Sequence, residues 1–146
     1  MASCLINYNK LGHLGWNDLK SIYEIRNLSK SEQENFFKNK KVKDLLLFFM
    51  DGNYLIKAEK IQSKKIRILQ QDSNIKEFRT IEKGYHIIIN IKEKLIIHDC
   101  LYWIHQCSNH YKLCKHVGKI FLILFKNDSK AILKDIILTD WNFEIL

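Results

Sequence analysis

The sequence predicts an α+β protein, because two kinds of hydrophobic pattern follow one another along the chain. Residues 16–61 place apolar side chains at helical spacing, whereas residues 65–98 hold short alternating and β-branched runs typical of antiparallel strands. Helical spacing returns over residues 117–124. This order of helices, a small antiparallel sheet and then a helix indicates an α+β fold with a helical N-terminal region.

The N-terminal region is expected to contain three helices. The first covers residues 16–28, where the apolar positions fit one face of an amphipathic helix. Ser31-Glu32-Gln33-Glu34 has the form of a capping box, which predicts a longer helix over residues 31–51. Gly52 is a natural stop for that helix, and residues 53–61 predict a further short one.

Strands are expected in the middle of the chain, before a second helical part. Residues 85–91 and 95–98 read as a hairpin that turns over Lys92-Glu93-Lys94. Earlier β-rich runs predict strands at residues 65–69 and 75–81. A final helix is predicted over residues 129–138, with Trp141 and Phe143 closing the core.

Composition and charge limit the kind of protein this is. The chain has 146 residues, 47% of them hydrophobic, which excludes a disordered chain and suffices for one core without disulfides. Its apolar runs are too short to span a bilayer and its start lacks the pattern of a signal peptide. A cytoplasmic protein is expected, or a nuclear one in a eukaryote, neither secreted nor bound to a membrane. The net charge of +8 favours a polyanionic partner.

Potential metal ligands gather around the end of the predicted hairpin. His98 and Cys100 stand two residues apart at the end of a strand, so their side chains point to the same side. Cys114 and His116 have the same spacing where a loop leads into a helix. Two such pairs, separated by a thirteen-residue loop, predict one tetrahedral zinc ion that ties the hairpin to the helix.

The fourth ligand has an alternative within the loop. Cys107 could replace His98, giving a site with three cysteines and one histidine. Either set supplies four protein donors and leaves no position for a reactive water, so the zinc is predicted to be structural. A Cys–His nucleophile pair lacks a third group to orient it, and no enzyme activity is expected.

The ligand pattern, His98-x-Cys100-x13-Cys114-x-His116, resembles the SWIM-type zinc finger family, whose pattern is CxC, a variable loop and CxH. A hairpin runs into the first pair, Trp103 follows it, and an apolar helix follows the second pair, as in that family. The chain departs from the pattern in having His98 for the first cysteine and Leu101 for the usual proline. The predicted organisation is a helical N-terminal region, a SWIM-type zinc-binding module, and a C-terminal helix and tail on the same domain, at residues 1–54, 55–126 and 127–146.

Size and layout resemble most closely the short SWIM-domain subunits of Shu-type recombination mediator complexes. The resemblance implies a non-catalytic protein of DNA recombination and repair that binds a RecA/Rad51-like paralogue and DNA, expected in single-stranded form. A zinc-containing DNA-binding regulator and a protein-interaction adaptor without a recombinase partner are the alternatives. The sequence does not distinguish single-stranded DNA from duplex DNA or RNA, and it leaves the oligomeric state open.

Basic and aromatic side chains near the ligand pairs are the predicted nucleic-acid contacts. Lysines would meet phosphates, and exposed aromatic rings would stack on the bases of a single strand. The predicted contacts are Lys112, Lys115, Lys119, Tyr102 and Tyr111 beside the zinc site, with Lys64, Lys65 and Arg67 before the first strand and on it.

Overall fold

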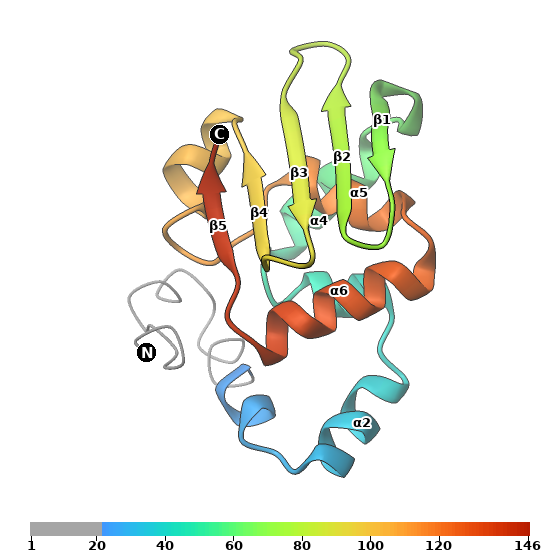
Figure 1. Ribbon diagram of the computed structural model, residues 1–146, viewed down its shortest axis with the longest axis vertical. Coiled ribbons are helices and arrows are strands. Elements are labelled where there is room, and N and C mark those ends of the chain that lie inside the picture. The colour runs from blue at the N-terminus through green and yellow to red at the C-terminus, as the bar shows by residue number, and fades with distance from the viewer. Residues whose placement is uncertain (1–21) are drawn as a thin grey trace.

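The structure, a computed structural model, describes residues 22–146 and has an α+β fold, which confirms the predicted fold class (Figure 1). Besides helical residues 22–26, the elements are α2 (Lys30–Lys38), α3 (Val42–Leu46), α4 (Gly52–Lys60), η2 (Ser63–Lys65), β1 (Ile66–Gln71), β2 (Ile75–Thr80), β3 (His86–Asn90), β4 (Leu95–His98), η3 (Trp103–Cys107), α5 (Lys115–Ile123), α6 (Lys126–Leu138) and β5 (Asn142–Ile145). The first six positions of the helix predicted over residues 16–28 lie outside the described residues.

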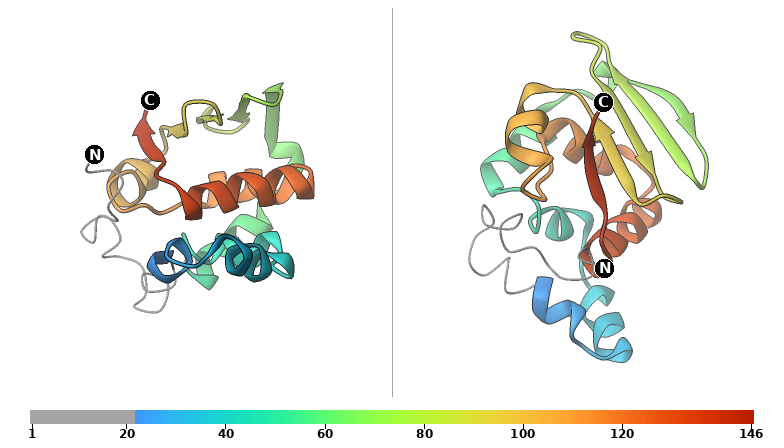
Figure 2. Two further views of the ribbon diagram at one scale, coloured as in Figure 1. Left: turned by 60° about the horizontal axis from the view of Figure 1, so that its bottom comes forward. Right: turned by 60° about the vertical axis from the view of Figure 1, so that its left-hand side comes forward.

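The described chain forms three layers. Helices α5 and α6 lie between the sheet on one side and the N-terminal helices α3 and α4 on the other (Figure 2). No described element covers the opposite face of the sheet. The boundary predicted at residues 54 and 55 falls inside α4, and buried side chains from all three predicted parts join one hydrophobic core.

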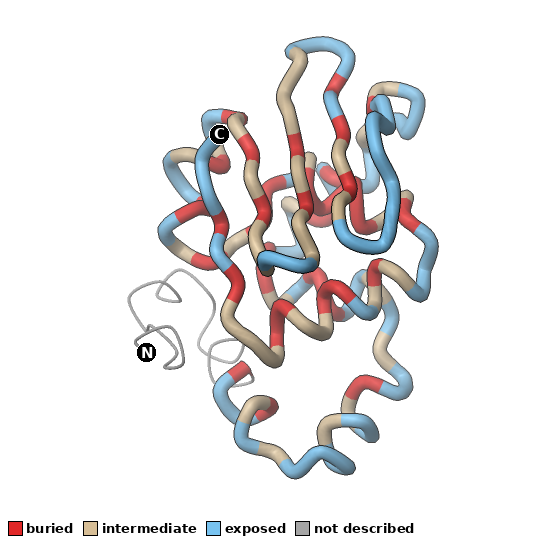
Figure 3. Tube along the Cα trace, in the orientation of Figure 1, coloured by how far each residue is buried: buried red, intermediate tan, exposed pale blue. Residues whose placement is uncertain are grey.

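The five strands lie in chain order, and only the last pair is parallel. Strands β1 to β4 form antiparallel hairpins, and β5 returns to pair with β4 after a crossover through η3, α5 and α6. Buried and less buried positions alternate along β2, β3 and β4, whereas β1 is mostly exposed (Figure 3). The sequence predicted core burial of Trp141 and Phe143, which the structure confirms, but not the strand that carries Phe143.

The prediction of a single helix over residues 31–51 is wrong. The chain instead forms α2, breaks at Asn39 and Lys40, and restarts as α3. After this break, α3 packs against α5 and α6, and Leu45, Leu46 and Phe49 are buried.

The predicted stop at Gly52 is also wrong, because this residue begins α4. The preceding Asp51 is the N-cap, and its carboxylate accepts a hydrogen bond of 2.9 Å from the backbone N–H of Tyr54.

Later in the chain, Gly118 allows α5 to approach α4 closely. A Cβ atom there would lie 3.0 Å from Met50 Cε and 3.4 Å from Ala58 Cβ, so the glycine helps to fix the position of α5.

The capping box of α2 lies two residues earlier than the sequence predicted. The Ser29 hydroxyl accepts from the Glu32 N–H at 3.2 Å, and the Glu32 carboxylate accepts from the Ser29 N–H at 3.1 Å. We expect Ser29→Ala to lower the free energy of unfolding by about 1 kcal/mol, because one N–H at the start of the helix loses its partner. Urea unfolding measures this cost. Ser31→Ala is the control, since the Ser31 hydroxyl lies 3.4 Å from Ser29 Oγ and does not cap the helix; equal costs for the two variants would contradict the assignment.

Arg26 ties the first described helical stretch to the end of α6. Its Nε donates to the carbonyl of Ile137 at 2.7 Å, and Nη2 donates to the carbonyl of Thr139 at 2.9 Å. Nη1 forms an ion pair of 2.8 Å with Asp140. A cation at this point satisfies carbonyl groups that the end of a helix leaves without partners.

Candidate metal centre

The structure brings together the four residues that the paired spacing predicted. One donor atom from each of His98, Cys100, Cys114 and His116 can be chosen so that all four lie within 4.8 Å of one another. The first three residues are buried and His116 is half-buried. His98 ends β4, whereas Cys114 is the N-cap of α5 and His116 lies in its first turn. The group could therefore hold a metal ion between the hairpin and the helix.

Hydrogen bonding fixes the His98 ring so that one nitrogen faces the group without a partner. Its Nδ1 lies 2.6 Å from the carbonyl oxygen of His86, and a carbonyl only accepts, so Nδ1 carries the proton and donates. The backbone N–H of His86 in turn donates to Asp99 at 2.8 Å. Nε2 is buried and makes no hydrogen bond to any described residue. A metal ion bonded to Nε2 would remove this energetic cost.

The surroundings shift the pKa values of the two thiols in opposite directions. The pKa of Cys100 is lowered, chiefly by the neighbouring Cys114 thiol and less by the nearby imidazoles of His116 and His98. Burial raises the pKa of Cys114, and its hydrogen bond with Cys100 raises it further. The N–H of Trp103 donates to Cys100 Sγ at 3.3 Å, which also supports negative charge on that sulfur.

The start of α5 places the second pair of donors. Cys114 makes no side-chain capping bond, so its sulfur remains available although the residue occupies the N-cap. The free N–H groups at a helix start favour a thiolate there. His116 Nδ1 lies 4.0 Å from Cys114 Sγ, and the rings of His98 and His116 are 5.6 Å apart. This separation fits two donors to one ion, which each ligand approaches to about 2.0–2.3 Å.

The alternative ligand, Cys107, is not a member of this group. It lies at the end of η3, a π-helical turn that occupies part of the interval expected to be a loop. The residue is fully buried, and burial, followed by the charge of Cys100, raises the pKa of the Cys107 thiol to about 12. The set with Cys107 is therefore not the one that the described structure brings together.

Two of the predicted nucleic-acid contacts are buried, which corrects the prediction. Tyr111 is 7% exposed, its ring stacks on Phe143 at 4.8 Å, and its hydroxyl donates to the carbonyl of Ile136 at 2.8 Å. This ring has no face to offer a base. Lys119 is also buried, in α5, because the helix turns that position toward the interior.

The remaining predicted contacts lie at or near the surface. Lys64, Arg67 and Lys115 are exposed, and Lys112 is half-buried. Lys65 forms an ion pair with Glu82. Tyr102 is half-buried and stacks on Tyr54, with ring centroids 4.5 Å apart, so one face of its ring is already covered.

Sequence reasoning missed two residues that shape the centre. His86 accepts the hydrogen bond that orients His98, and its position opposite the end of β4 follows only from the strand register. Tyr85 places its ring 5.4 Å from the His116 ring and 6.1 Å from the His98 ring. The predicted hairpin at residues 85–98 contained both residues but did not assign them to the centre.

The fold and this group together define an α+β protein with a closed cluster of two histidines and two cysteines. Comparison with protein-family models, curated proteins and solved structures finds no match. Within residues 22–146, no helix has both the length and the apolar character needed to cross a membrane.

Proposed function

We propose that this chain is a non-catalytic, SWIM-type zinc protein that binds single-stranded DNA. The observation that carries the zinc part is the buried Nε2 of His98, which lacks a partner and belongs to a group with two cysteines and a second histidine. Two thiolates and two imidazoles are donors that suit Zn²⁺, and with them the site is neutral overall. Four protein donors fill the tetrahedron, so the ion holds the hairpin against α5 and activates no water.

The nucleic-acid part of the proposal is supported by charge close to this centre. The chain carries a net charge of +8, and Lys64 in η2, Arg67 in β1 and Lys115 at the start of α5 are all exposed. The two ligand pairs lie on β4 and the segment after it and on α5, so a zinc ion would fix the hairpin relative to Lys115 at the start of α5. The resemblance to SWIM proteins extends the proposal to a RecA/Rad51-like paralogue as partner and to DNA recombination and repair as the process.

The purified protein is expected to contain about one zinc per chain, because the group supplies one set of four donors. Its affinity for an oligothymidylate should fall steeply with salt, with log K changing by about −0.7 per phosphate contact for each unit of log salt concentration. Elemental analysis and fluorescence anisotropy at several salt concentrations measure these two quantities. Absence of zinc would overturn the zinc assignment. Zinc without DNA binding would leave the adaptor alternative, and co-purification with a recombinase paralogue tests the partner.

A further inference from the structure

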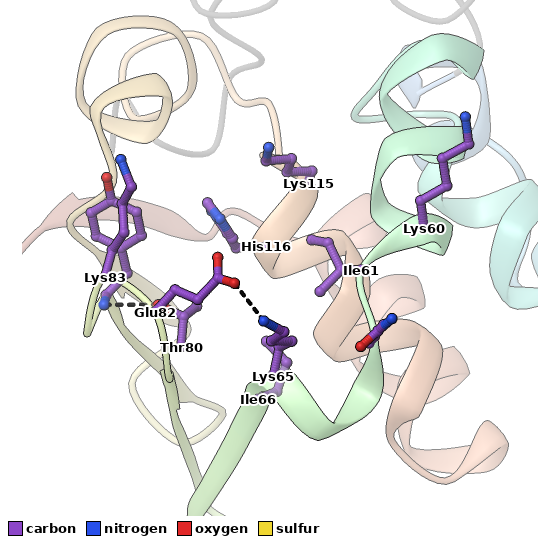
Figure 4. Close-up of a pocket in the computed structure, with 11 residues that line it drawn as sticks. Lys60, Ile61, Lys65, Ile66, Thr80, Glu82, Lys83, Lys115 and His116 are labelled. Atoms are coloured by element: carbon purple, nitrogen blue, oxygen red, sulfur yellow. Dashed lines mark hydrogen bonds and ion pairs between the residues drawn. The ribbon is translucent and has the colours of Figure 1, made fainter.

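A cavity of about 470 Å³ opens beside the candidate metal centre, between η2, the β2–β3 turn and the start of α5 (Figure 4). This volume lies within the range of about 300–1,000 Å³ found for small-ligand sites. The charged residues that line it, besides the half-buried His116, are Lys60, Lys65, Lys83, Lys115 and Glu82. The lining therefore carries an excess of three positive charges, which favours an anionic ligand.

Three of these ammonium groups are available to a ligand. Lys65 forms an ion pair with Glu82. It lowers the pKa of Glu82 by its hydrogen bond and by its charge, and the charge of Lys83 lowers this pKa slightly further. The side chains of Lys60 and Lys115 make no hydrogen bond or ion pair with a described residue. Figure 4 shows Lys60 on α4, Lys83 beside the strands and Lys115 on α5, distributed around the opening. A phosphate at this opening would meet cations from three separate elements.

The rest of the lining suits the base and sugar of a nucleotide. Ile61 and Ile66 supply apolar surface, and Tyr85 supplies a half-buried aromatic ring. Stacking on an aromatic side chain beside lysines that meet phosphates is the usual way in which proteins bind single strands. The cavity thus has both lysines for a phosphate and an aromatic ring for a base. At the surface that the sequence predicted, the buried Tyr111 offers no ring to a base.

His116 belongs both to the metal group and to the wall of this cavity. The ring nitrogen near Cys114 Sγ is Nδ1, at 4.0 Å. A metal ion bonded to Nδ1 leaves Nε2 protonated, and a ligating histidine ordinarily donates this second N–H to an acceptor. The ring that lines the cavity would then offer a donor suited to a phosphate oxygen.

We propose that this cavity binds one nucleotide of a single-stranded DNA, with its phosphate held by Lys60, Lys83 and Lys115 and its base against Tyr85. The inference rests on the proposed function, because it assigns a place on the structure to the DNA. It differs from the surface that the sequence predicted, since Lys83 and Tyr85 were not among the predicted contacts and Lys119 and Tyr111 are buried.

A charge-matched pair of variants tests the assignment. Lys60 lies in the last turn of α4 and Lys83 in the turn after β2, whereas Lys38 lies in the last turn of α2 and Lys92 in the turn after β3, outside the cavity. The double variant Lys60→Gln/Lys83→Gln is compared with Lys38→Gln/Lys92→Gln by anisotropy with the zinc-loaded protein and (dT)15. Both variants lose the same charge from exposed positions.

We expect the cavity variant to bind about tenfold more weakly and its salt slope to flatten by about 0.7, the value for the one phosphate that the cavity is proposed to hold on a single strand. The control variant should bind nearly as the unmodified protein does. Equal weakening in both variants, or in neither, overturns the cavity assignment while the proposed function stands. If the unmodified zinc protein does not bind (dT)15 at all, the proposed function and the cavity assignment fall together. Amide chemical shifts of Tyr85 and His116 should move on titration with (dT)15; unchanged shifts would also contradict the assignment.

Discussion

His98→Ala is expected to release the metal from the purified protein and to destabilise its fold strongly. The variant removes the buried Nε2 that has no other partner, and three donors remain. Binding of a structural zinc contributes an apparent free energy of about 10–16 kcal/mol in small zinc-finger peptides, and this energy is also folding energy. The zinc content measured by elemental analysis should fall from about one ion per chain to near none. The midpoint of urea unfolding should shift to a lower urea concentration.

Two other variants provide the comparison. Cys107→Ser should keep the zinc, although placing a hydroxyl at this fully buried position is expected to cost about 1–3 kcal/mol of stability. His105→Ala should change neither quantity, because His105 is exposed and outside the metal group. Zinc retained by His98→Ala and lost by Cys107→Ser would move the site to Cys100, Cys107, Cys114 and His116.

Trp103→Ala is expected to lower the free energy of unfolding by about 3–5 kcal/mol, the usual cost of removing a large buried ring. Trp103 is fully buried, with its ring centroid 5.6 Å from the His98 ring and 5.3 Å from the Phe143 ring. Its Nε1 donates to the carbonyl of Glu144 at 2.9 Å, so it connects η3 to β5. Removing the ring leaves a cavity where the metal centre meets the last strand. Urea unfolding of the zinc-loaded protein measures the cost.

Trp103→Phe separates ring volume from hydrogen bonding. It keeps an aromatic ring beside His98 and Phe143 but leaves the carbonyl of Glu144 without its donor. A smaller cost of about 1–2 kcal/mol is expected for this variant. A cost below about 1 kcal/mol for Trp103→Ala would show that the ring does not carry the packing assigned to it.

The parts of the fold that sequence predicted well depend on local patterns. Runs of β-branched isoleucine marked the β3–β4 hairpin, in which Ile87, Ile89 and Ile96 are buried. The four grouped donors were predictable for a related reason. The first pair lies at the end of β4, where extended backbone turns residues two apart to the same side, and the second pair lies at the start of α5.

The parts that sequence did not predict depend on contacts between distant segments. Strand β5 pairs with β4 only after a long crossover, so no neighbouring hairpin marks it in the sequence. Tyr111 has a positive φ of 56°, and its burial depends on Phe143 and Ile136, which lie far along the chain. Composition around Tyr111 suggested an exposed aromatic residue. Only the tertiary arrangement shows that its ring belongs to the core.

The crossover between β4 and β5 would give a metal ion bound by these four residues a role in the order of folding. Strands β1 to β4 form from neighbouring hairpins, whereas β5 can pair only after a long segment has closed upon itself. Both pairs of ligands lie at the beginning of this route, at the end of β4 and the start of α5. An ion bound there early would shorten the loop that must still close. The pairing of β5 with β4 would then be faster.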